Sequence, residues 1–576
     1  MEQIEQKDSR SSNSHTINQF IKVIVFLLLL LMIFSISFTP LRTDNDVWWH
    51  LKTGKVIVEN NYKLPENDIF AYTSENIEWH NHEWLSEVIF YLVYSFGETR
   101  GFGGIRTLIL FKTLILILTG LVLFYLVLMR TKNFSVAIFA TILAALLMKR
   151  TIYVRPPIFT YLFLSISLLI LYNVKERRWR QKNLIIFPFL FILWANIHGG
   201  FLTGLVLIGA FWFESFVNFV RGRFFKVLEH SEEKNLFAPL SLTLFFSFLG
   251  SLITPYGITL YFLTARVMGD TRLVRSIGEL LSPDFFFTWA FEGAIIFLIV
   301  GFSIIKKTII SLAEILLFIF FFHQAIQHVR HIPLFGIISI GVFGALLNEI
   351  LNEINFSSRF KNAGNYLLLI FSVILIFFSV FHKREGESFI ERNLHLFSDE
   401  ESYVNNYPVE VADFILSNPF EGKMFNQINY AGYLIWRMSP EKHKIFTDSR
   451  FDIFGSKFIW DMMDIEAGVD YSSVGRNYED LLNKYQINFV VVERGARLNY
   501  KLENNPDWKM VYFYLSTYAQ STDSGYSIFV RNVEENKKLV DSCQKCFKSI
   551  IRIKKRPYPS FLIEKVLGKS EKETGF

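Results

Sequence analysis

Two carboxylates, two indoles and an imidazole stand together near residue 45, in the order Thr43-Asp44-Asn45-Asp46-Val47-Trp48-Trp49-His50. A carboxylate in a partly dry site can have a raised pKa and take a proton from a substrate hydroxyl. Asp44 and Asp46 therefore stand out as candidates for acid–base chemistry. As an alternative, an Asp at this position caps the N-terminus of a helix over 47–58.

Other polar side chains stand in the segments between long apolar runs. Arginines there suit a phosphate or diphosphate group, because guanidinium groups offer forked donors and keep their charge. The competing interpretation is that each one anchors the chain to lipid headgroups. The predicted substrate-binding and phosphate-binding residues are His50, His82, Glu83, Arg155, His198, Tyr256, Arg272, Arg275, Arg330 and His331.

The histidines have alternative roles. His198 stands between Asn196 and a glycine pair, where it either approaches a ligand or satisfies the carbonyl groups of an interrupted helix. His50, His80, His82 and Glu83 are zinc ligands by residue type, but 80–83 lacks the i, i+4 spacing of the helical zinc motif. We expect His82 and Glu83 to orient the aromatic helix that follows them.

The composition indicates a membrane protein. Of the 576 residues, 51% are hydrophobic and only 19% are charged, and the net charge of +6 shows no separate basic domain for nucleic acid. Repeated apolar runs predict a polytopic α-helical membrane protein with about eleven transmembrane helices. The predicted spans are 20–38, 105–129, 134–148, 158–174, 184–198, 200–220, 236–254, 286–305, 309–327, 332–349 and 364–381.

Basic residues in alternate loops predict the orientation. With residues 1–19 as a cytoplasmic tail, every inside loop carries Lys or Arg, as the positive-inside rule requires. The first apolar run is expected to be a retained helix and not a signal peptide. The candidate site residues then lie on the extracytoplasmic side.

The predicted transmembrane domain covers 20–381 and includes a large first outer loop over 39–104. Tryptophans 48, 49 and 79 in that loop indicate short helices in the membrane interface. A linker over 382–402 leads to an extracytoplasmic α/β domain over 403–533, and 534–576 forms a basic tail. In the α/β domain we expect helices over 407–416 and 479–485, and strands over 444–448, 487–492 and 526–530.

Polar residues of this α/β domain fall near the predicted strand ends, where such domains bind ligands. Asn426, Tyr430, Asp448 and Arg450 are examples. The competing interpretation is that Asp448 and Arg450 pair with each other to fix a turn.

Together these features resemble the GT-C superfamily of membrane glycosyltransferases, which use polyprenyl-phosphate-linked sugar donors. The resemblance rests on the first span, the Asp-containing segment after it, the large first outer loop, the number of spans and the outer C-terminal domain. Five segments also resemble uncharacterised bacterial multi-span proteins placed near that superfamily: 44–54, 82–85, 154–157, 194–200 and 446–450.

The resemblance implies an enzyme that moves a sugar from a polyprenyl-phosphate-linked donor to a lipid, glycan or protein acceptor. Asp44 or Asp46 would act as general base or hold a divalent cation, Mg²⁺ or Mn²⁺. Arg155, Arg272, Arg275 and Arg330 would share a lipid-accessible pocket with the acidic pair and stabilise the leaving phosphate. The reaction would take place at the outer face of a bacterial cytoplasmic membrane.

Two points limit this expectation. The second outer loop, 149–157, contains no acid, so a metal held between two loops lacks its expected second donor. A non-catalytic glycan-lipid transporter or assembly partner is the alternative function. A transporter places ionisable residues deep in its spans, whereas the spans here are nearly free of charge.

Overall fold

The computed structural model describes the chain except for residues 1, 40, 42–43, 226–235, 285–287, 305–309, 354–357, 382–406, 472–475, 516–524 and 544–576. Thr43 and the predicted linker over 382–402 thus lie outside the described residues. The chain divides into two compact units. Unit 1 comprises Met1–Pro40, Asn81–Met268 and Ile277–Ser402, and unit 2 comprises Leu41–His80, Gly269–Ser276 and Tyr403–Phe576.

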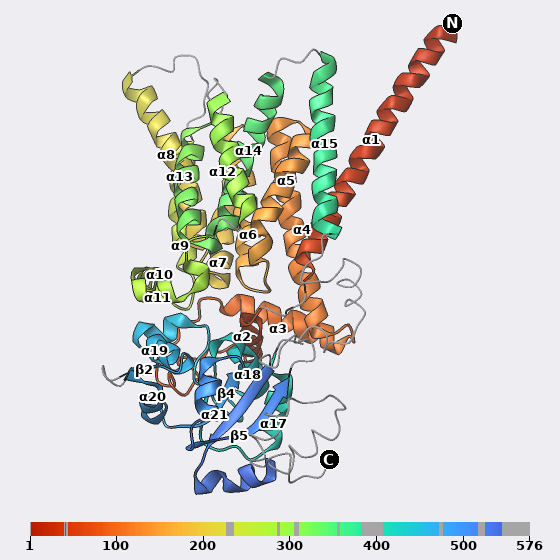
Figure 1. The fold of residues 1–576 in the computed structure, drawn as a ribbon. Helices are drawn as coiled ribbons and strands as arrows, with labels where there is room; N and C mark the ends of the chain where they lie inside the picture. The colour runs from red at the N-terminus through yellow and green to blue at the C-terminus, as the bar shows by residue number, and fades with distance from the viewer. Residues whose placement is uncertain are drawn as a thin grey trace. The chain divides into compact units, whose positions relative to one another are not determined.

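Unit 1 is built from helices, several of which run side by side (Figure 1). Its α-helices are α1 (Glu2–Ser37), α3 (Trp84–Thr99), α4 (Gly104–Thr131), α5 (Phe134–Met148), α6 (Pro157–Lys175), α7 (Ile186–Ile197), α8 (Phe201–Phe225), α9 (Phe237–Ser251), α10 (Thr259–Gly269), α12 (Trp289–Ile304), α13 (Leu312–Gln327), α14 (Ile332–Glu353) and α15 (Ser358–Phe381). Short 3-10 turns are η1 (Lys149–Thr151), η2 (Gln181–Ile185), η3 (Gly278–Leu280) and η4 (Val329–His331).

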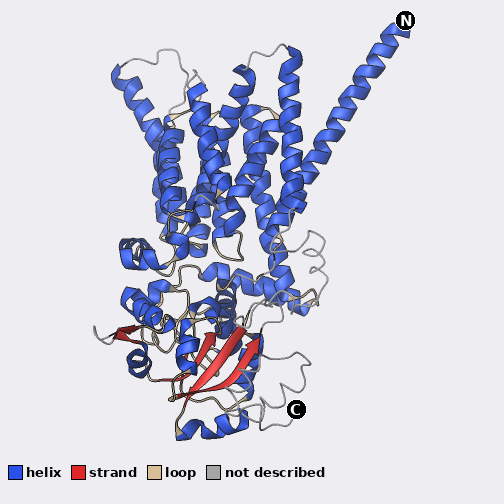
Figure 2. Cartoon of the chain, viewed as in Figure 1, coloured by secondary structure: helices blue, strands red, loops and turns tan. Residues whose placement is uncertain are grey.

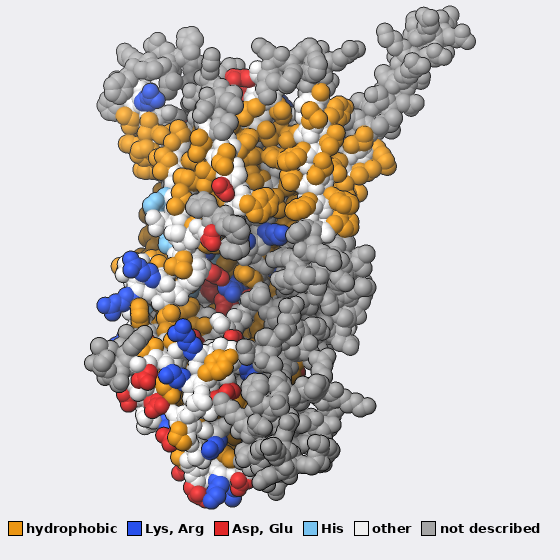
Figure 3. Space-filling view, in the orientation of Figure 1, with side chains coloured by type: hydrophobic (Ala, Val, Ile, Leu, Met, Phe, Trp, Pro, Cys, Tyr) orange, Lys and Arg blue, Asp and Glu red, His pale blue; other side chains and the backbone are white. Residues whose placement is uncertain are grey.

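Seven described helices are long and apolar enough to cross a bilayer, judged by length and composition. They are Gln19–Ser37, Gly104–Thr131, Phe134–Thr151, Pro157–Lys175, Phe201–Arg223, Val329–Glu353 and Ala363–Phe381. Four shorter apolar helices overlap the remaining predicted spans: Gln181–Ile197, Phe237–Ser251, Trp289–Ile299 and Leu312–Gln327. The chain is a membrane protein, and the number of eleven spans stays a prediction. Hydrophobic side chains cover much of the surface of these helices (Figure 3).

Helix ends in unit 1 follow local sequence signals. Asn133 caps α5 by accepting a hydrogen bond from the Val136 N–H, 3.3 Å away. Ser311 and Glu314 form a reciprocal capping box at the start of α13. In both helices, side-chain oxygens accept hydrogen bonds from backbone N–H groups that would otherwise lack partners at the helix start.

Small residues and one buried charge cluster set the packing of unit 1. A Cβ atom at Gly344 of α14 would lie 2.6 Å from a methyl carbon of Val127 of α4, so a larger residue there would force Val127 or a helix to shift. Arg130 Nη1 of α4 lies 2.7 Å from Glu314 Oε1 of α13, and the Tyr172 hydroxyl of α6 donates to the same oxygen at 2.7 Å. The cluster links three helices, and its charges compensate one another.

Unit 2 contains all the described strands (Figure 2). Its α-helices are α2 (Asp46–Glu59), α11 (Thr271–Ser276), α17 (Val409–Ser417), α18 (Ala431–Met438), α19 (Phe451–Glu466), α20 (Tyr478–Lys484) and α21 (Arg497–Glu503), with 3-10 turns η6 (Ile428–Tyr430) and η8 (Glu534–Asn536). Its strands are β1 (Lys423–Phe425), β2 (Asp470–Tyr471), β3 (Arg476–Asn477), β4 (Ile487–Glu493), β5 (Trp508–Leu515) and β6 (Gly525–Arg531).

Four strands form a mixed sheet in the order β1-β4-β6-β5. β1 runs parallel to β4, and the other pairs are antiparallel, with Val491 opposite Ile528. Residues 489–492 of β4 are all buried, as expected for a central strand covered on both faces. The predicted strands over 487–492 and 526–530 are confirmed as β4 and β6.

The strand predicted over 444–448 is wrong. In this segment only Ile445 forms a bridge, a parallel one to Ala71. The Phe446 N–H donates instead to the Asn426 side-chain oxygen at 2.7 Å, so a side chain takes the place of a neighbouring strand. The segment is therefore extended without belonging to the sheet.

The predicted first outer loop, 39–104, is divided between the two units. Its part over 41–80 packs in unit 2, where α2 lies against α18. A Cβ atom at Gly432 of α18 would lie 2.2 Å from the Asn45 carbonyl oxygen, so this contact requires glycine. Trp48 is 3% exposed and packs edge-on against Tyr407 and Tyr433.

The predicted interfacial position of tryptophans 48, 49 and 79 is therefore wrong. All three are buried within unit 2, at 3%, 7% and 3% exposure. Their aromatic area contributes to the core of this unit, which a pattern of single tryptophans cannot distinguish from a place at the membrane interface.

The carboxyl group of Glu466, near the end of α19, gives unit 2 a pH-dependent stability. Burial raises the pKa of Glu466 to about 7, helped by Glu493 and opposed by the Ile428 N–H. The folded state thus holds a proton on this group that the unfolded state loses above its lower pKa. This stabilising contribution is complete below pH 4.5 and falls away as the pH rises to 7.

We expect Glu466→Gln to stabilise the protein relative to the wild type by about 2 kcal/mol more at pH 8 than at pH 5. Thermal unfolding of the purified protein in detergent at both pH values measures this difference. Glu534→Gln, at an exposed position on η8, is the matched control. An equal effect of Glu466→Gln at both pH values contradicts the prediction.

Candidate functional site

The acidic pair begins α2 in unit 2. Asp44 is 2% exposed, and its carbonyl oxygen accepts a hydrogen bond of 2.8 Å from the Tyr407 hydroxyl. Asp46, the first residue of α2, is half-buried, and its carboxylate accepts a hydrogen bond from the Ser449 hydroxyl. The N-cap position belongs to Asn45, which forms no side-chain cap. The capping alternative is therefore wrong for Asp46.

Ser449 orients the Asp46 carboxylate from a segment about 400 residues away. The Trp49 indole N–H donates to the Ser449 hydroxyl oxygen at 3.1 Å, which leaves the hydroxyl proton for Asp46. The buried His50 ring lies beside Trp49, with ring centroids 3.7 Å apart. These contacts join two of the five segments that carry the resemblance, 44–54 and 446–450.

Next to Ser449, a buried ion triad fixes the same segment. Arg450 Nη1 lies 2.8 Å from Asp68 Oδ1, and Arg450 binds Asp448 in a bidentate manner through Nε at 2.9 Å and Nη2 at 2.6 Å. No residue of the triad is more than 3% exposed. The guanidinium carbon lies 4.5 Å from the centroid of the Trp79 ring. The interpretation that Asp448 and Arg450 pair to fix a turn is confirmed, and Asp68 is the third member.

The triad carries two carboxylates and one guanidinium group. Burial raises the pKa of Asp448, and the Arg450 charge opposes this rise. For Arg450, burial lowers the pKa, but Asp448 and Asp68 more than offset that effect and keep the guanidinium group charged. The Ser74 hydroxyl and the Phe70 and Ala71 N–H groups also donate to Asp68, so four donor groups hold this carboxylate. The arrangement is rigid and positions Ser449.

In unit 1, a second constellation joins two of the resembling segments with Thr160 of α6. His198 Nε2 lies 3.6 Å from Glu83 Oε1, and His82 Nε2 lies 3.8 Å from the same oxygen. The Thr160 hydroxyl lies 2.8 Å from His198 Nδ1, one turn after the prolines 156 and 157 that begin α6. The segments 82–85 and 194–200 thus meet around Glu83 and His198, and Thr160, three residues after the segment 154–157, contacts His198.

Hydrogen bonds define the tautomer of His198. The Gly200 N–H donates to His198 Nδ1 at 3.0 Å, so a neutral ring carries its proton on Nε2, which faces Glu83. The Trp194 indole donates to the Thr160 hydroxyl at 2.9 Å, which leaves that hydroxyl to donate to Nδ1. A carboxylate and an imidazole of defined tautomer suit binding of a polar substrate or transfer of a proton.

The Asn196 side chain ties the end of α7 to the segment that follows α9. Its amide donates to the carbonyl oxygens of Ile192 and Ile253, both at 2.8 Å. Its oxygen accepts from the Trp84 indole at 2.9 Å, which anchors the start of α3. Both predicted roles of His198 stay predictions.

The predicted arginines occupy different surroundings. In unit 1, Arg155 pairs with Glu279 at 2.9 Å, and Arg330 is exposed in η4. In unit 2, Arg272 and Arg275 are exposed on α11. The expectation that these four side chains share a pocket with the acidic pair stays a prediction.

Two further predicted site residues lie in turns of unit 1. Tyr256 is half-buried between α9 and α10. His331 belongs to η4, with its ring centroid 5.3 Å from that of His328. Their geometry suits a structural role as well as a substrate contact.

Solved structures resemble the chain, although no protein-family model and no curated protein sequence matches it. The oligosaccharyltransferase of Archaeoglobus fulgidus in the apo form matches with a TM-score of 0.51 and 13% identity, over 82% of this chain and 69% of that one. The arabinofuranosyltransferase AftD from Mycobacteria matches with a TM-score of 0.51 and 12% identity, over 88% of this chain and 41% of that one. Both are members of the GT-C superfamily. The chain has a GT-C fold.

The GT-C resemblance predicted from the sequence is thus confirmed at the level of the fold. The structure shows the contact of the Asp46 carboxylate with Ser449, whereas the catalytic role of Asp46 stays a prediction. The substrate-binding roles predicted for the histidines, Glu83, Tyr256 and the arginines also stay predictions.

A divalent cation is one alternative that the GT-C resemblance raised, and the donors present do not fit it. Among the residues that the structure describes, no group of three or more His, Cys, Asp or Glu side chains is arranged to hold a metal ion. The four residues considered for zinc, His50, His80, His82 and Glu83, form no such group either. Asp46 is engaged by Ser449, and 149–157 supplies no carboxylate.

Sequence reasoning gave no role to several residues that build these constellations. Ser449 and Trp194 belong to the resembling segments 446–450 and 194–200, whereas Asp68 and Thr160 lie outside all five segments. The local signal for Asp68 is its position before Phe70 and Ala71, whose N–H groups it accepts in an Asx-type turn. A buried carboxylate needs more partners than such a turn provides.

Proposed function

We propose that the chain is a glycosyltransferase that moves a sugar from a polyprenyl-phosphate-linked donor to a lipid, glycan or protein acceptor. The observation that carries the proposal is the Asp46 carboxylate, half-buried at the start of α2 and oriented by Ser449 within a chain of GT-C fold. The apolar helices place the chain in a membrane, where a lipid-linked donor also lies. Positive-inside loops support a bacterial cytoplasmic membrane with unit 2 on the extracytoplasmic side.

Asp46 acts as the general base. Its carboxylate takes the proton of the acceptor hydroxyl, the hydroxyl oxygen forms a bond to the anomeric carbon of the donor, and the bond from that carbon to the phosphate oxygen breaks. Polyprenyl phosphate leaves with the bonding electrons. Asp46 is a better candidate than Asp44, because it is the more exposed of the two and its carboxylate is held by a neutral hydroxyl donor.

Cationic side chains stabilise the leaving phosphate. Arg272, Arg275 and Arg330 are exposed and available for this role, whereas Arg155 is already paired with Glu279. His50, His82, Tyr256 and His331 remain proposed substrate contacts. Glu83 and His198 are the most defined of the polar groups proposed for substrate binding. The Thr160 hydroxyl and the Gly200 N–H hold His198 Nδ1, and His198 Nε2 lies 3.6 Å from Glu83 Oε1.

The experiment uses membranes from cells that produce the full chain and a set of polyprenyl-phosphate sugars labelled in the sugar. Transfer of label to an endogenous acceptor, with loss of transfer in Asp46→Asn and unchanged protein level, supports the glycosyltransferase. A non-catalytic carrier or assembly partner would bind the labelled lipid without consuming it. Binding without product across the donor set therefore contradicts the proposal.

Glu83→Gln and His198→Ala are each expected to lower kcat/KM by about tenfold to a hundredfold, as for loss of a charge-assisted contact. Initial rates with the labelled donor measure the effect. Glu66→Gln, an exposed glutamate of the same predicted outer loop, is the control and should keep the wild-type rate. Wild-type rates in both test variants would remove Glu83 and His198 from the substrate-binding set.

A further inference from the structure

A short segment of unit 1, residues 277–281, contains the turn η3 and is fixed to the start of η4. The Val329 N–H donates to the Leu281 carbonyl oxygen at 3.0 Å. His328 Nδ1 lies 2.6 Å from the Leu280 carbonyl oxygen. The segment is therefore held beside η4, which carries two of the predicted phosphate-binding residues.

From this segment, Glu279 reaches the loop before α6. Arg155 Nη1 donates to Glu279 Oε1 at 2.9 Å, and the two side chains are 19% and 47% exposed. Arg155 is also held from its own loop, because its guanidinium carbon lies 4.8 Å from the centroid of the Tyr153 ring. The guanidinium group thus keeps this second contact when Glu279 moves away.

Three charged side chains lie within electrostatic range of the buried Tyr161 hydroxyl of α6, namely Arg155, Arg330 and Glu279. The hydroxyl itself donates to the Thr151 hydroxyl oxygen at 3.0 Å. Two guanidinium groups therefore share this region with one carboxylate. The carboxylate lowers the local positive charge, and an incoming anion meets the full charge of both arginines only after Glu279 has left.

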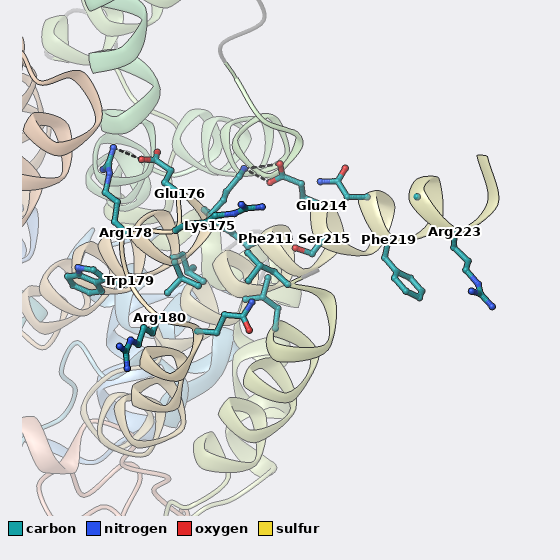
Figure 4. Close-up of a pocket in the computed structure, with 18 residues that line it drawn as sticks. Lys175, Glu176, Arg178, Trp179, Arg180, Phe211, Glu214, Ser215, Phe219 and Arg223 are labelled. Atoms are coloured by element: carbon teal, nitrogen blue, oxygen red, sulfur yellow. Dashed lines mark hydrogen bonds and ion pairs between the residues drawn. The ribbon is translucent and has the colours of Figure 1, made fainter. Parts of the chain in front are cut away.

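Another ion pair of unit 1 shows how a more strongly held carboxylate looks. Lys175 Nζ contacts both carboxylate oxygens of Glu214, at 2.8 Å and 2.7 Å, and Glu214 is only 12% exposed (Figure 4). Glu279 contacts Arg155 through one oxygen and is about half exposed. Water and salt screen an exposed pair of this kind, so it contributes little free energy. The contact between Arg155 and Glu279 is therefore the one that a competing anion breaks more easily.

We propose that Glu279 is an internal competitor for the phosphate group of polyprenyl phosphate at Arg155. The inference rests on the proposed function, which supplies this phosphate. Without a substrate, the Glu279 carboxylate accepts the hydrogen bond from Arg155 Nη1. A phosphate displaces the carboxylate, because its oxygens accept the forked hydrogen bonds of a guanidinium group. When the polyprenyl phosphate leaves, Glu279 binds Arg155 again.

The test measures binding of farnesyl phosphate to the purified full-length protein in detergent, with farnesol as the probe that lacks the phosphate. The test variants are Glu279→Gln, Arg155→Gln and the two combined. Glu66→Gln, at another exposed position, is the control for the loss of one negative charge. Thermal unfolding checks that the variants fold. Binding needs no sugar transfer, so the measurement does not depend on the reaction that the protein catalyses.

We expect Glu279→Gln to bind farnesyl phosphate about threefold to fivefold more tightly than the wild type, which is the range for removal of an exposed competing ion pair. Arg155→Gln should bind it at least about tenfold more weakly. Addition of Glu279→Gln to Arg155→Gln should change the affinity by less than about twofold, because the shared partner is gone. Glu66→Gln should also stay within about twofold of the wild type, and farnesol should bind all the proteins equally.

An unchanged affinity in Glu279→Gln overturns the proposal, even if Arg155→Gln does not fold. An equal gain with and without Arg155, or an equal gain in Glu66→Gln, overturns it as well, because the carboxylate would then only repel the phosphate. If the expected pattern appears but no labelled donor gives sugar transfer, the exchange at Arg155 stands and the proposed glycosyltransferase does not.

Discussion

Asp46→Asn is expected to lower the rate of sugar transfer by about a hundredfold to ten-thousandfold, because an amide cannot take the proton of the acceptor hydroxyl. The substituted side chain keeps its shape, and its oxygen can still accept the hydrogen bond from Ser449. We therefore expect the fold to persist. Initial rates in membranes that contain equal amounts of wild type and variant measure the effect.

Two companion variants separate chemistry from positioning. Ser449→Ala removes the donor and leaves the carboxylate, so we expect a loss of about tenfold together with a changed pH profile. Asp44→Asn should cost less than Asp46→Asn, since Asp44 is 2% exposed. If Asp44→Asn abolishes transfer and Asp46→Asn stays within about threefold of the wild type, the base is Asp44 and our assignment is wrong.

Arg450→Met is expected to destabilise unit 2 by about 3–5 kcal/mol, because it leaves the carboxylates of Asp68 and Asp448 buried without their cation. For a unit of this size the midpoint of thermal unfolding should fall by roughly 10 °C. Arg450→Lys should recover only part of the loss, since an ammonium group cannot make the bidentate contact with Asp448. Thermal unfolding of the purified protein measures both changes.

The matched control neutralises the whole triad. Arg450→Met combined with Asp68→Asn and Asp448→Asn leaves no uncompensated buried charge, so it should be clearly more stable than Arg450→Met alone. If the triple variant is the less stable of the two, the loss comes from side-chain packing around Trp79 and not from charge.

The sequence predicted best what local periodicity determines. The central strand over 487–492 is apolar except for Asn488, and the structure has β4 there with residues 489–492 buried. The helix over 479–485 appears as α20, displaced by one residue. The segment 444–448 shows where this reasoning ends. Its apolar residues are buried, but its partners are Ala71 and Asn426, which no local pattern identifies.

The candidate site depended on contacts between distant segments. The sequence predicted Asp44, Asp46 and the surrounding aromatic residues as one group, but it left open what orients them. Ser449 reaches Asp46 from about 400 residues away, and the register of that contact depends on a buried triad whose third member, Asp68, lies in a loop. Whether a carboxylate caps a helix, has a structural role or acts in catalysis depends on how deeply it is buried. The fold determines that burial, and the local sequence pattern does not.

The pH dependence of the first-turnover rate in proteoliposomes with a labelled polyprenyl-phosphate sugar tests the role of Asp46 most directly. For the wild type we predict a rate that rises as a carboxylate loses its proton and then reaches a plateau. For Asp46→Asn we predict a residual rate at least about a hundredfold lower that lacks this rise. The same acid limb in both proteins would contradict the assignment of Asp46 as the general base.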